Sequence, residues 1–467
     1  MKISIQVMID DEHGQTHLEE IVQLEKATTE DALVGLSLVE SKAVLKTLQS
    51  VIVQRQAQLY SKAHRCCPEC QKPRRIKGST TIQHRTLFGI VSIPNQRLYT
   101  CTCHSGESKT LSVLSAWLPE HNSPELQYLE TKWASLMSYG LTVDLLKDVL
   151  PINEGLNAET VRKHLHKVAA RQDDNLQESP SLVSGCAYEW GQLPKPDKPL
   201  TVGIDGGYVK SCCDKQNNFE VIVGKCFSKT KKGKRLGFVQ TLDKNPKKRL
   251  MELLNRQGLQ ANQQITFLSD GGDTVRELQY IMHPEAEHVL DWFHVTMRLT
   301  VLNQFAKGLV ITDPEDGARI TKDLDSAKWY LWHGNVKNAL DKLDYCYCIL
   351  ADEEVQYANR MKFQKTVEDM MKYIDNNRHL IPNYGEKYRY GETITTSFVE
   401  STVNEVVAKR MVKKQQMQWS QQGAHCLLQT RTAVLNDELR AHFEEWYPAM
   451  KTKNKTSEPT MDLQMVA

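Results

Sequence analysis

Between residues 199 and 295, strand-like and helix-like patterns alternate in an order that leaves few folds open. Three apolar runs, "LTVGIDGGYVK", "NFEVIVGKCF" and "RLGFVQTL", follow one another with turns between them. A helical run "PKKRLMELLNRQGL", a strand "QITFLSDGG", a helix "DTVRELQYIM" and a strand "EHVLDWFHV" complete the segment. The order β-β-β-α-β-α-β predicts a mixed sheet flanked by helices.

Two aspartates stand at the ends of apolar runs in this segment, and two glycines follow each of them. Asp205 follows "LTVGI" and Asp270 follows "ITFLS". A carboxylate at the mouth of a buried strand is costly to desolvate, so it usually has a function. The glycines would let a backbone or a phosphate approach. On neighbouring strands the two carboxylates could share a bridging Mg²⁺, although Asp-Gly turns at strand ends are the alternative explanation.

A third acid lies much later, in "TTSFVESTVNEVVAKRM" at residues 395–411. Glu405 is five residues after Glu400, about 140° further around a helix, so only one of the two can face the same site. The small neighbours Ser397 and Ser401 favour Glu400 as the acid that points inward. We therefore predict a structural or surface role for Glu405.

The run "DWFHV" places Asp291 and His294 three residues apart at the end of the last strand. This pair could complete a metal site, or the aspartate could cap the helix that follows while the histidine accepts or donates a hydrogen bond. We interpret the two residues as supporting the site and not as metal ligands.

Cysteines occur in two short pairs, "CPEC" and "CTC", with 30 residues between them that have the pattern of a hairpin. This spacing predicts a zinc-ribbon-like segment with a structural Zn²⁺, which would hold together a domain too small to bury its own core. Either Cys66 or His104 could replace one ligand, and four reduced thiols are the alternative to a metal site. The predicted zinc ligands are Cys67, Cys70, Cys101 and Cys103.

Basic residues gather in three places that suit contact with DNA. A helix beginning at Ala158 fits the second helix of a helix-turn-helix, which enters the major groove. Between Lys225 and Arg249 there are ten Lys or Arg against one acid, and another basic run follows the helix with Glu400. Solvated surfaces are the alternative. The predicted DNA-binding residues are Arg162, Lys163, Lys167, Lys229, Lys231, Lys232, Lys234, Arg235, Lys409, Arg410, Lys413 and Lys414.

A chain of 467 residues is long enough for several domains. It has no apolar run long enough to span a membrane and no signal-peptide core at its start, so we expect a cytoplasmic location and no membrane partner. The expected division is an N-terminal strand and helical segment at 1–63, a zinc-ribbon-like domain at 64–118, a helical DNA-binding domain at 119–175, a linker at 176–198, a first core segment at 199–295, an all-α insertion at 296–393, a second core segment at 394–450 and a disordered tail at 451–467.

The segments "VGIDGGYV", "FLSDGG", "DWFHV" and "VESTVNEVVAKRM" together resemble the DDE transposases of bacterial insertion sequences, most closely the ISKra group and its Mutator-like relatives. The cysteine-rich segment is similar to their zinc-binding segment, so the resemblance spans roughly residues 64 to 432. It implies a multidomain α/β protein with an RNase H-like core whose triad is Asp205, Asp270 and Glu400.

The same resemblance implies a function. Asp291 and His294 match the Asp-x-x-His signature, and the helical stretch before Glu400 matches the family's insertion domain. Two Mg²⁺ or Mn²⁺ ions held by the triad would serve in-line attack on a phosphodiester.

The partners would be terminal inverted repeats and target DNA, bound by a homodimer or larger assembly that associates with the bacterial nucleoid. A nuclease or domesticated derivative without strand transfer, and a catalytically inactive zinc-ribbon DNA-binding protein, are the two other functions that fit the sequence.

Overall fold

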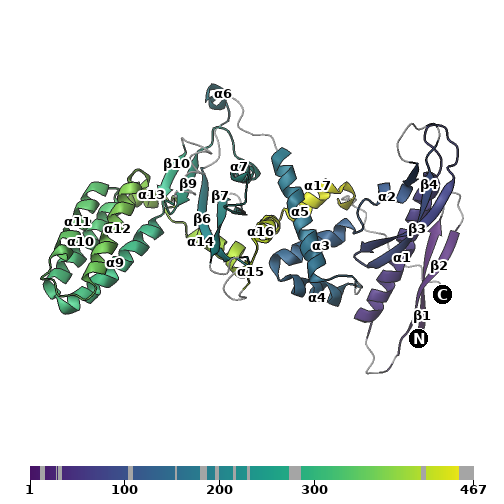
Figure 1. The fold of residues 1–467 in the computed structure, drawn as a ribbon, viewed down its shortest axis with the longest axis horizontal. Coiled ribbons are helices and arrows are strands. Elements are labelled where there is room, and N and C mark those ends of the chain that lie inside the picture. Colours follow the sequence, from purple (N-terminus) through teal and green to yellow (C-terminus); the bar gives the residue numbers. More distant parts are fainter. Residues whose placement is uncertain are drawn as a thin grey trace. The chain divides into compact units, whose positions relative to one another are not determined.

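The protein is a mixed α/β chain with helices and three separate sheets in the residues that the structure, a computed structural model, describes (Figure 1). These residues are 1–10, 16–27, 29, 34–101, 103, 109–152, 155–178, 187–194, 199–213, 217–228, 232–272, 286–411 and 417–451. They form two compact units, one from residues 1–168 with the segment from residue 437 onward, the other from residues 169–436. Within the described ranges, no helix is both long and apolar enough to cross a membrane.

The first unit begins with an antiparallel hairpin of β1 (Lys2–Asp10) and β2 (Thr16–Glu25), followed by the long helix α1 (Leu38–Ala63). The helix starts at a capping box, in which Ser37 and Glu40 each bind the other's backbone amide. This hairpin and helix agree with the strand-then-helix pattern of the sequence.

A three-stranded antiparallel sheet follows, in the order β3 (Ile76–Thr86), β4 (Gly89–Tyr99) and β5 (Thr110–Ser112), and leads into the short helix α2 (Val113–Trp117). Its apolar core joins Ile82, Val91 and Ile93 to Leu114 and to Ala57 of α1. The segments that we predicted as separate domains at 1–63 and 64–118 therefore share one core.

Helices complete the first unit: α3 (Pro124–Leu136), α4 (Tyr139–Val149) and the first half of α5 (Ala158–Glu178). The C-terminal helix α17 (Leu439–Trp446), with a 3₁₀ turn at Pro448–Met450, packs on α3. There Arg440 forms a 2.7 Å ion pair with Glu125, and the rings of Tyr128 and Phe443 meet edge to face. The second core segment that we predicted at 394–450 therefore does not match this division, because residues from 437 onward group with the first unit.

The second unit contains the sheet predicted from residues 199–295. Its strands are β6 (Leu200–Lys210), β7 (Asn218–Phe227), β8 (Lys234–Val239), β9 (Ile265–Ser269) and β10 (Glu287–Leu290), with α7 (Pro246–Arg256) between β8 and β9. The spatial order is β10-β9-β6-β7-β8, in which β6, β7 and β8 are antiparallel and β9 and β10 run parallel to β6. The helix predicted at "DTVRELQYIM" lies outside the described residues, and a short helix, α6 (Ala187–Gly191), lies in the expected linker.

Helices cover the sheet of the second unit. Buried leucines of α7 pack on apolar side chains of β6, β7 and β9. The segment after the insertion provides α14 (Ser397–Val403), a π-helical turn (Asn404–Ala408), α15 (Lys409–Met411) and α16 (Gln421–Leu435). Of these, α14 contacts β6 and β7, and α16 contacts β8.

The insertion consists of α9 (Trp292–Thr312), α10 (Pro314–Trp332), α11 (Val336–Ala351), α12 (Arg360–Asn376), a 3₁₀ turn (Arg378–Leu380) and α13 (Tyr384–Arg389). Residues 291–393 are all described and contain no strand, as the sequence predicted. The helices begin directly after β10, four residues earlier than we expected. Leu268 and Leu290 of the sheet belong to the same apolar core as Leu299 and Phe363, so the insertion packs on the sheet as one body with it.

Candidate functional site

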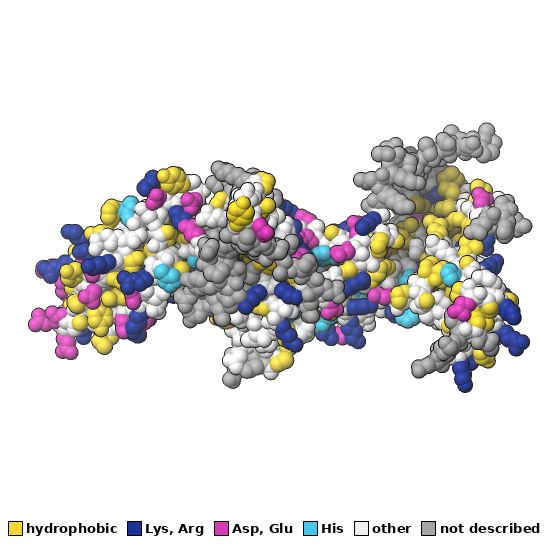
Figure 2. All heavy atoms as spheres, turned by 90° about the horizontal axis from the view of Figure 1, so that it is seen from above, with side chains coloured by type: hydrophobic (Ala, Val, Ile, Leu, Met, Phe, Trp, Pro, Cys, Tyr) yellow, Lys and Arg dark blue, Asp and Glu magenta, His cyan; other side chains and the backbone are white. Residues whose placement is uncertain are grey.

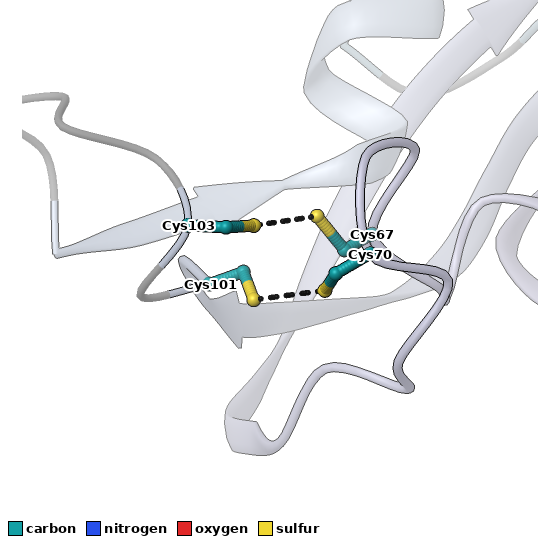
Figure 3. A group of neighbouring side chains, drawn as sticks. All are labelled: Cys67, Cys70, Cys101 and Cys103. Atoms are coloured by element: carbon teal, nitrogen blue, oxygen red, sulfur yellow. Dashed lines mark hydrogen bonds between the residues drawn. The ribbon is translucent and has the colours of Figure 1, made fainter.

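Four cysteines converge in the first unit, two from the turn after α1 and two from the chain after β4 (Figure 3). Their Sγ atoms all lie within 4.8 Å of one another, with 3.4 Å from Cys67 to Cys103 and 3.3 Å from Cys70 to Cys101. The group comprises Cys67, Cys70, Cys101 and Cys103, which are the four predicted ligands. Four thiolate donors this close could hold a structural metal such as Zn²⁺. Cys66 is exposed and outside the group, and His104 is outside the described residues.

The backbone around the cysteines already suits thiolates. Two backbone hydrogen bonds close a tight turn here. The Cys67 amide donates to the Lys72 carbonyl, and the Gln71 amide donates to the Cys67 carbonyl, with Gln71 at φ 60°. The backbone amide of Cys70 donates to the sulfur of Cys67 and, against the effect of burial, lowers the pKa of this thiol to about 6. The amide of Cys103 likewise lowers the pKa of Cys101. A metal binds the thiolate form, which these amides favour at Cys67 and Cys101. The neighbouring thiols have the opposite effect at Cys70 and Cys103, where they raise the pKa.

Asp205, Asp270 and Asp291, the three aspartates singled out from the sequence, lie on or directly after three neighbouring strands, β6, β9 and β10. The register of β6 on β9 pairs residues 200–203 with 265–268, and two further steps bring Asp270 opposite Asp205. The register of β9 on β10 pairs Ser269 with Leu290, and one further step brings Asp291 beside Asp270. The sheet topology alone therefore gathers residues that are far apart in the sequence.

Helix α14 brings Glu400 to the strand that carries Asp205. A Cβ added to Gly203 would come 2.1 Å from Val399, and one added to Gly207 would come 3.3 Å from Val403. The two glycines flank Asp205 on β6, so the helix can lie directly on the strand there. Glu400 follows Val399 on this helix and is half-buried.

The structure gives the glycines next to the aspartates other roles than the phosphate approach we expected. Gly207 faces helix α14. Gly271 has φ +84° and makes the turn after β9, while the amide of Gly272 donates to Asp270 at 2.9 Å. Gly203, which decides how close α14 can come, was not singled out from the sequence, because the "VGID" pattern alone does not show what packs on it.

The charges of these acids interact, and we refer to Asp205, Asp270 and Glu400 as the acid centre. Burial and the charges of Asp270 and Glu400 raise the pKa of Asp205 to about 6, against a hydrogen bond from Gly206 and the charge of His294. The pKa of His294 is raised in turn, mainly by its hydrogen bond to Asp291 and also by Asp270 and Asp205. The acid centre thus places three carboxyl groups near His294, and the neighbouring aspartates favour the protonated form of this histidine.

The acid centre is more open than the cysteine group. In the described part of the chain, only the four cysteines form a group of three or more metal-ligating side chains whose ligand atoms all lie within 4.8 Å of one another. Carboxylates repel one another when no cation lies between them, which explains the wider spacing. Half-buried oxygen donors that face one another are nevertheless the ligand type preferred by Mg²⁺ and Mn²⁺.

Asp291 connects two helices of this region. Its fully buried carboxylate accepts hydrogen bonds from the Phe293 amide, from His294 Nδ1 at 2.7 Å, and from both the amide and the hydroxyl of Thr396. The Thr396 carbonyl accepts the Glu400 amide at 3.0 Å. Of the two roles that the sequence left open, the carboxylate therefore performs the capping role, and it also anchors the start of α14.

Two tyrosines of the insertion fix the ends of the strands that carry the aspartates. The Tyr373 hydroxyl donates to the main-chain carbonyl of Asp270 at 2.9 Å, and the Tyr384 hydroxyl donates to that of Leu290 at 2.8 Å. Sequence reasoning did not identify either tyrosine, because each is one aromatic residue among many in an amphipathic helix. The insertion thus helps to shape the acid centre.

Two of the predicted DNA-binding arginines are used within the fold. Arg235 pairs with Glu405 at 2.8 Å and donates to the Leu435 carbonyl, with only 13% of its side chain exposed. Arg410 is 2% exposed, and its guanidinium lies over the ring of Trp419. The predictions for Arg235 and Arg410 therefore do not fit the structure, whereas the structural role that we predicted for Glu405 agrees with its ion pair.

The other predicted DNA contacts are at the surface or outside the described residues. Arg162 and Lys163 on α5 share the partner Glu159, and Lys167 pairs with Glu120 at 2.8 Å. These three side chains are 42%, 71% and 57% exposed, so they remain open to a phosphate. Lys232 and Lys409 are exposed, Lys234 is half-buried, and Lys229, Lys231, Lys413 and Lys414 are not among the described residues.

Comparisons with known proteins add no assignment. No protein-family model matches the chain, and a search of the curated proteins finds no match.

Proposed function

We propose that the protein is a DDE-type DNA transposase with an RNase H-like core, which cuts phosphodiester bonds at transposon ends and joins strands. The observation that carries the proposal is the acid centre: the register of β6 and β9 aligns Asp205 with Asp270, and α14 delivers Glu400 to the same strand. The resemblance of the surrounding sequence segments to these transposases points in the same direction.

The donor set fits divalent cations. Asp205, Asp270 and Glu400 would hold the ions, and their half-burial limits competition from water. When bound, such ions polarise the phosphodiester and generate the attacking oxygen nucleophile. The surrounding residues orient the ligands: Asp291 fixes the start of α14, and Tyr373 fixes the backbone of Asp270.

His294 supplies a positive charge beside the carboxylates when it is protonated. Its Nδ1 is engaged by Asp291, so its Nε2 is the ring nitrogen left to face the acid centre or a substrate phosphate. In the first unit, the exposed cations of α5 suit DNA phosphates, and the cysteine group would stabilise the domain that carries them.

Strand-transfer assays test the proposal. The purified protein is incubated with Mg²⁺ or Mn²⁺, a target plasmid and a labelled duplex taken from the DNA that flanks its reading frame. We expect joined products from the wild type, and a loss of more than about a hundredfold in Asp205→Asn and Glu400→Gln, since removing even residues that only orient ligands costs 10–100-fold. Glu405→Gln is the matched control on the same segment.

The outcomes separate the three functions that the sequence leaves open. Cleavage without joined products would favour the nuclease alternative. DNA binding that needs neither Asp205 nor a divalent cation, without any cleavage, would favour the zinc-ribbon DNA-binding protein and overturn the enzyme proposal.

A further inference from the structure

An arginine of the insertion lies close to the acid centre and has no acidic partner. Arg298 is on α9, four residues after His294, so the two side chains leave the helix on the same face. Arg298 is exposed, and in the part of the chain that the structure describes no carboxylate forms an ion pair with it. Arg235 and Arg249 of the same unit, in contrast, are both bound by carboxylates.

An aromatic ring holds the Arg298 side chain in place. Its guanidinium carbon lies 4.0 Å from the centre of the Tyr373 ring, a short cation–π contact. The hydroxyl of that same tyrosine donates to the Asp270 carbonyl at 2.9 Å. Tyr373 therefore links the two residues: its ring contacts the guanidinium of Arg298, and its hydroxyl binds the backbone of Asp270.

The geometry leaves the guanidinium ready for an anion. A guanidinium carries five N–H donors in a planar fork that matches two oxygens of a phosphate, and this exposed group is open to solvent beside the Tyr373 ring. Contact with the ring also restricts the rotamers of the side chain in advance, so less entropy is lost on binding.

The visible surface of the insertion does not offer a broad basic face as an alternative. Figure 2 shows Lys and Arg side chains interspersed with Asp and Glu over the helices at the left of the view. Several cations of the insertion are paired with acids of their own helix, for example Arg319 with Glu315 and Lys372 with Glu368. Binding by the insertion would therefore depend on individual unpaired cations close to the acid centre.

We propose that Arg298 binds a DNA phosphate next to the acid centre, positioned by Tyr373, so that the helical insertion supplies a substrate contact as well as support. This inference rests on the proposed function, because it takes DNA as the substrate of the acid centre. The ligand is a phosphodiester oxygen pair of the backbone, and no base sequence is read by this contact.

The test measures binding of a short fluorescent DNA duplex to the full chain over a series of salt concentrations. We expect Arg298→Gln to weaken binding about tenfold and to reduce the slope of log K against log salt by about one. Arg298→Lys retains the charge without the fork of donors, so its affinity is expected between those of Arg298→Gln and the wild type. The matched control is Arg319→Ala, which removes an exposed arginine of the same insertion and leaves both quantities unchanged.

The aromatic support is tested separately. Tyr373→Phe keeps the ring and removes only the hydrogen bond to Asp270, so it should bind DNA more tightly than Tyr373→Leu, which removes the ring. Melting temperatures confirm that each variant is folded, and Arg298→Lys keeps the test valid if Arg298→Gln is unstable.

The proposal is overturned if folded Arg298→Gln binds DNA with the affinity and salt slope of the wild type. If the wild type cuts and joins DNA in that case, the proposed function stands and only the role of Arg298 fails. A wild-type protein that neither binds nor cuts DNA overturns both.

Discussion

The cysteine group and the acid centre are both clusters of metal-ligating side chains, but they differ in how complete they are. Four Sγ atoms lie within 4.8 Å of one another in the first unit, whereas among the described residues of the second unit no three carboxylates lie this close together. Sulfur atoms can share hydrogen bonds and stay close, as in the two S···S contacts of 3.3 and 3.4 Å. Carboxylates at neutral pH carry charge and repel one another.

The difference shows that the two groups of side chains are held in opposite ways. The cysteine turn is arranged by backbone hydrogen bonds that favour its ligand state. In the acid centre, burial and neighbouring charges act against the ionised Asp205, so this region stores unfavourable free energy that a cation would release. Perturbing each site should therefore change stability in opposite directions.

The largest expected effect is the loss of the structural metal. Cys67→Ser should abolish stoichiometric Zn²⁺ binding and unfold the zinc-ribbon-like part of the first unit, since Zn²⁺ contributes about 10 kcal/mol or more to such small domains. Elemental analysis and thermal unfolding measure this, with Cys66→Ser, the exposed neighbour outside the group, as the control. Equal zinc content in the two variants would show that Cys67 is not a zinc ligand, and the contrast with the acid centre would then fail.

The second effect concerns Asp291, which is buried like a structural residue although it lies beside Asp270. Asp291→Asn should lower the free energy of unfolding by about 3 kcal/mol, because the amide group would leave buried donors of Thr396 and His294 without an acceptor. Chemical denaturation gives the value. Stability equal to that of the wild type would show that this carboxylate does not hold α14.

Substitution of Asp205 should change the free energy of unfolding in the opposite direction, because Asp205→Asn should stabilise the protein. Because the pKa of Asp205 in the folded protein is raised to about 6, from 3.8, the folded state holds this proton more tightly and stability falls as pH rises between these values. Asp205→Asn should thus be more stable than the wild type above pH 6, by about 1 kcal/mol after allowance for solvent screening.

The effect of Mg²⁺ on the melting temperature is a second test of the acid centre. Mg²⁺ should raise the melting temperature of the wild type above pH 6, should have little effect well below that pH, and should not raise it in Asp205→Asn. Thermal unfolding with and without Mg²⁺ measures this shift. An Asp205→Asn variant that is less stable than the wild type at every pH would contradict the view that the acid centre is strained.

The smallest effect belongs to Glu405, the acid on the same segment that lies outside the acid centre. Glu405→Gln removes the ion pair with the mostly buried Arg235, so we expect a loss of about 1 kcal/mol. Thermal unfolding measures this loss, and it should show no dependence on Mg²⁺. A Mg²⁺ response that disappears in Glu405→Gln would assign this residue to the acid centre instead.

Local patterns in the sequence predicted much of this structure. Alternating and helical periodicities gave the succession of strands along the second unit and the helical insertion, and the spacing of the cysteines gave all four members of their group. These features depend on neighbours within a few residues, so one sequence contains the information.

Other features depend on contacts between distant segments, which one sequence does not show. The close packing at Gly203 depends on a helix almost 200 positions later, and Arg235 finds its acid 170 positions away. Likewise, no pattern in α17 indicates that it packs on α3. The placement of Tyr373 under Arg298 also follows only from how α9 and α12 pack.

The order of elements along the chain has a consequence for synthesis on the ribosome. Glu400 is made 130 positions after Asp270, which takes roughly 7 to 26 s at ordinary rates of translation. The first unit also needs α17, which is made only after all of the second unit. A nascent chain therefore cannot complete the acid centre or the first unit until segments far downstream of their first residues have been made.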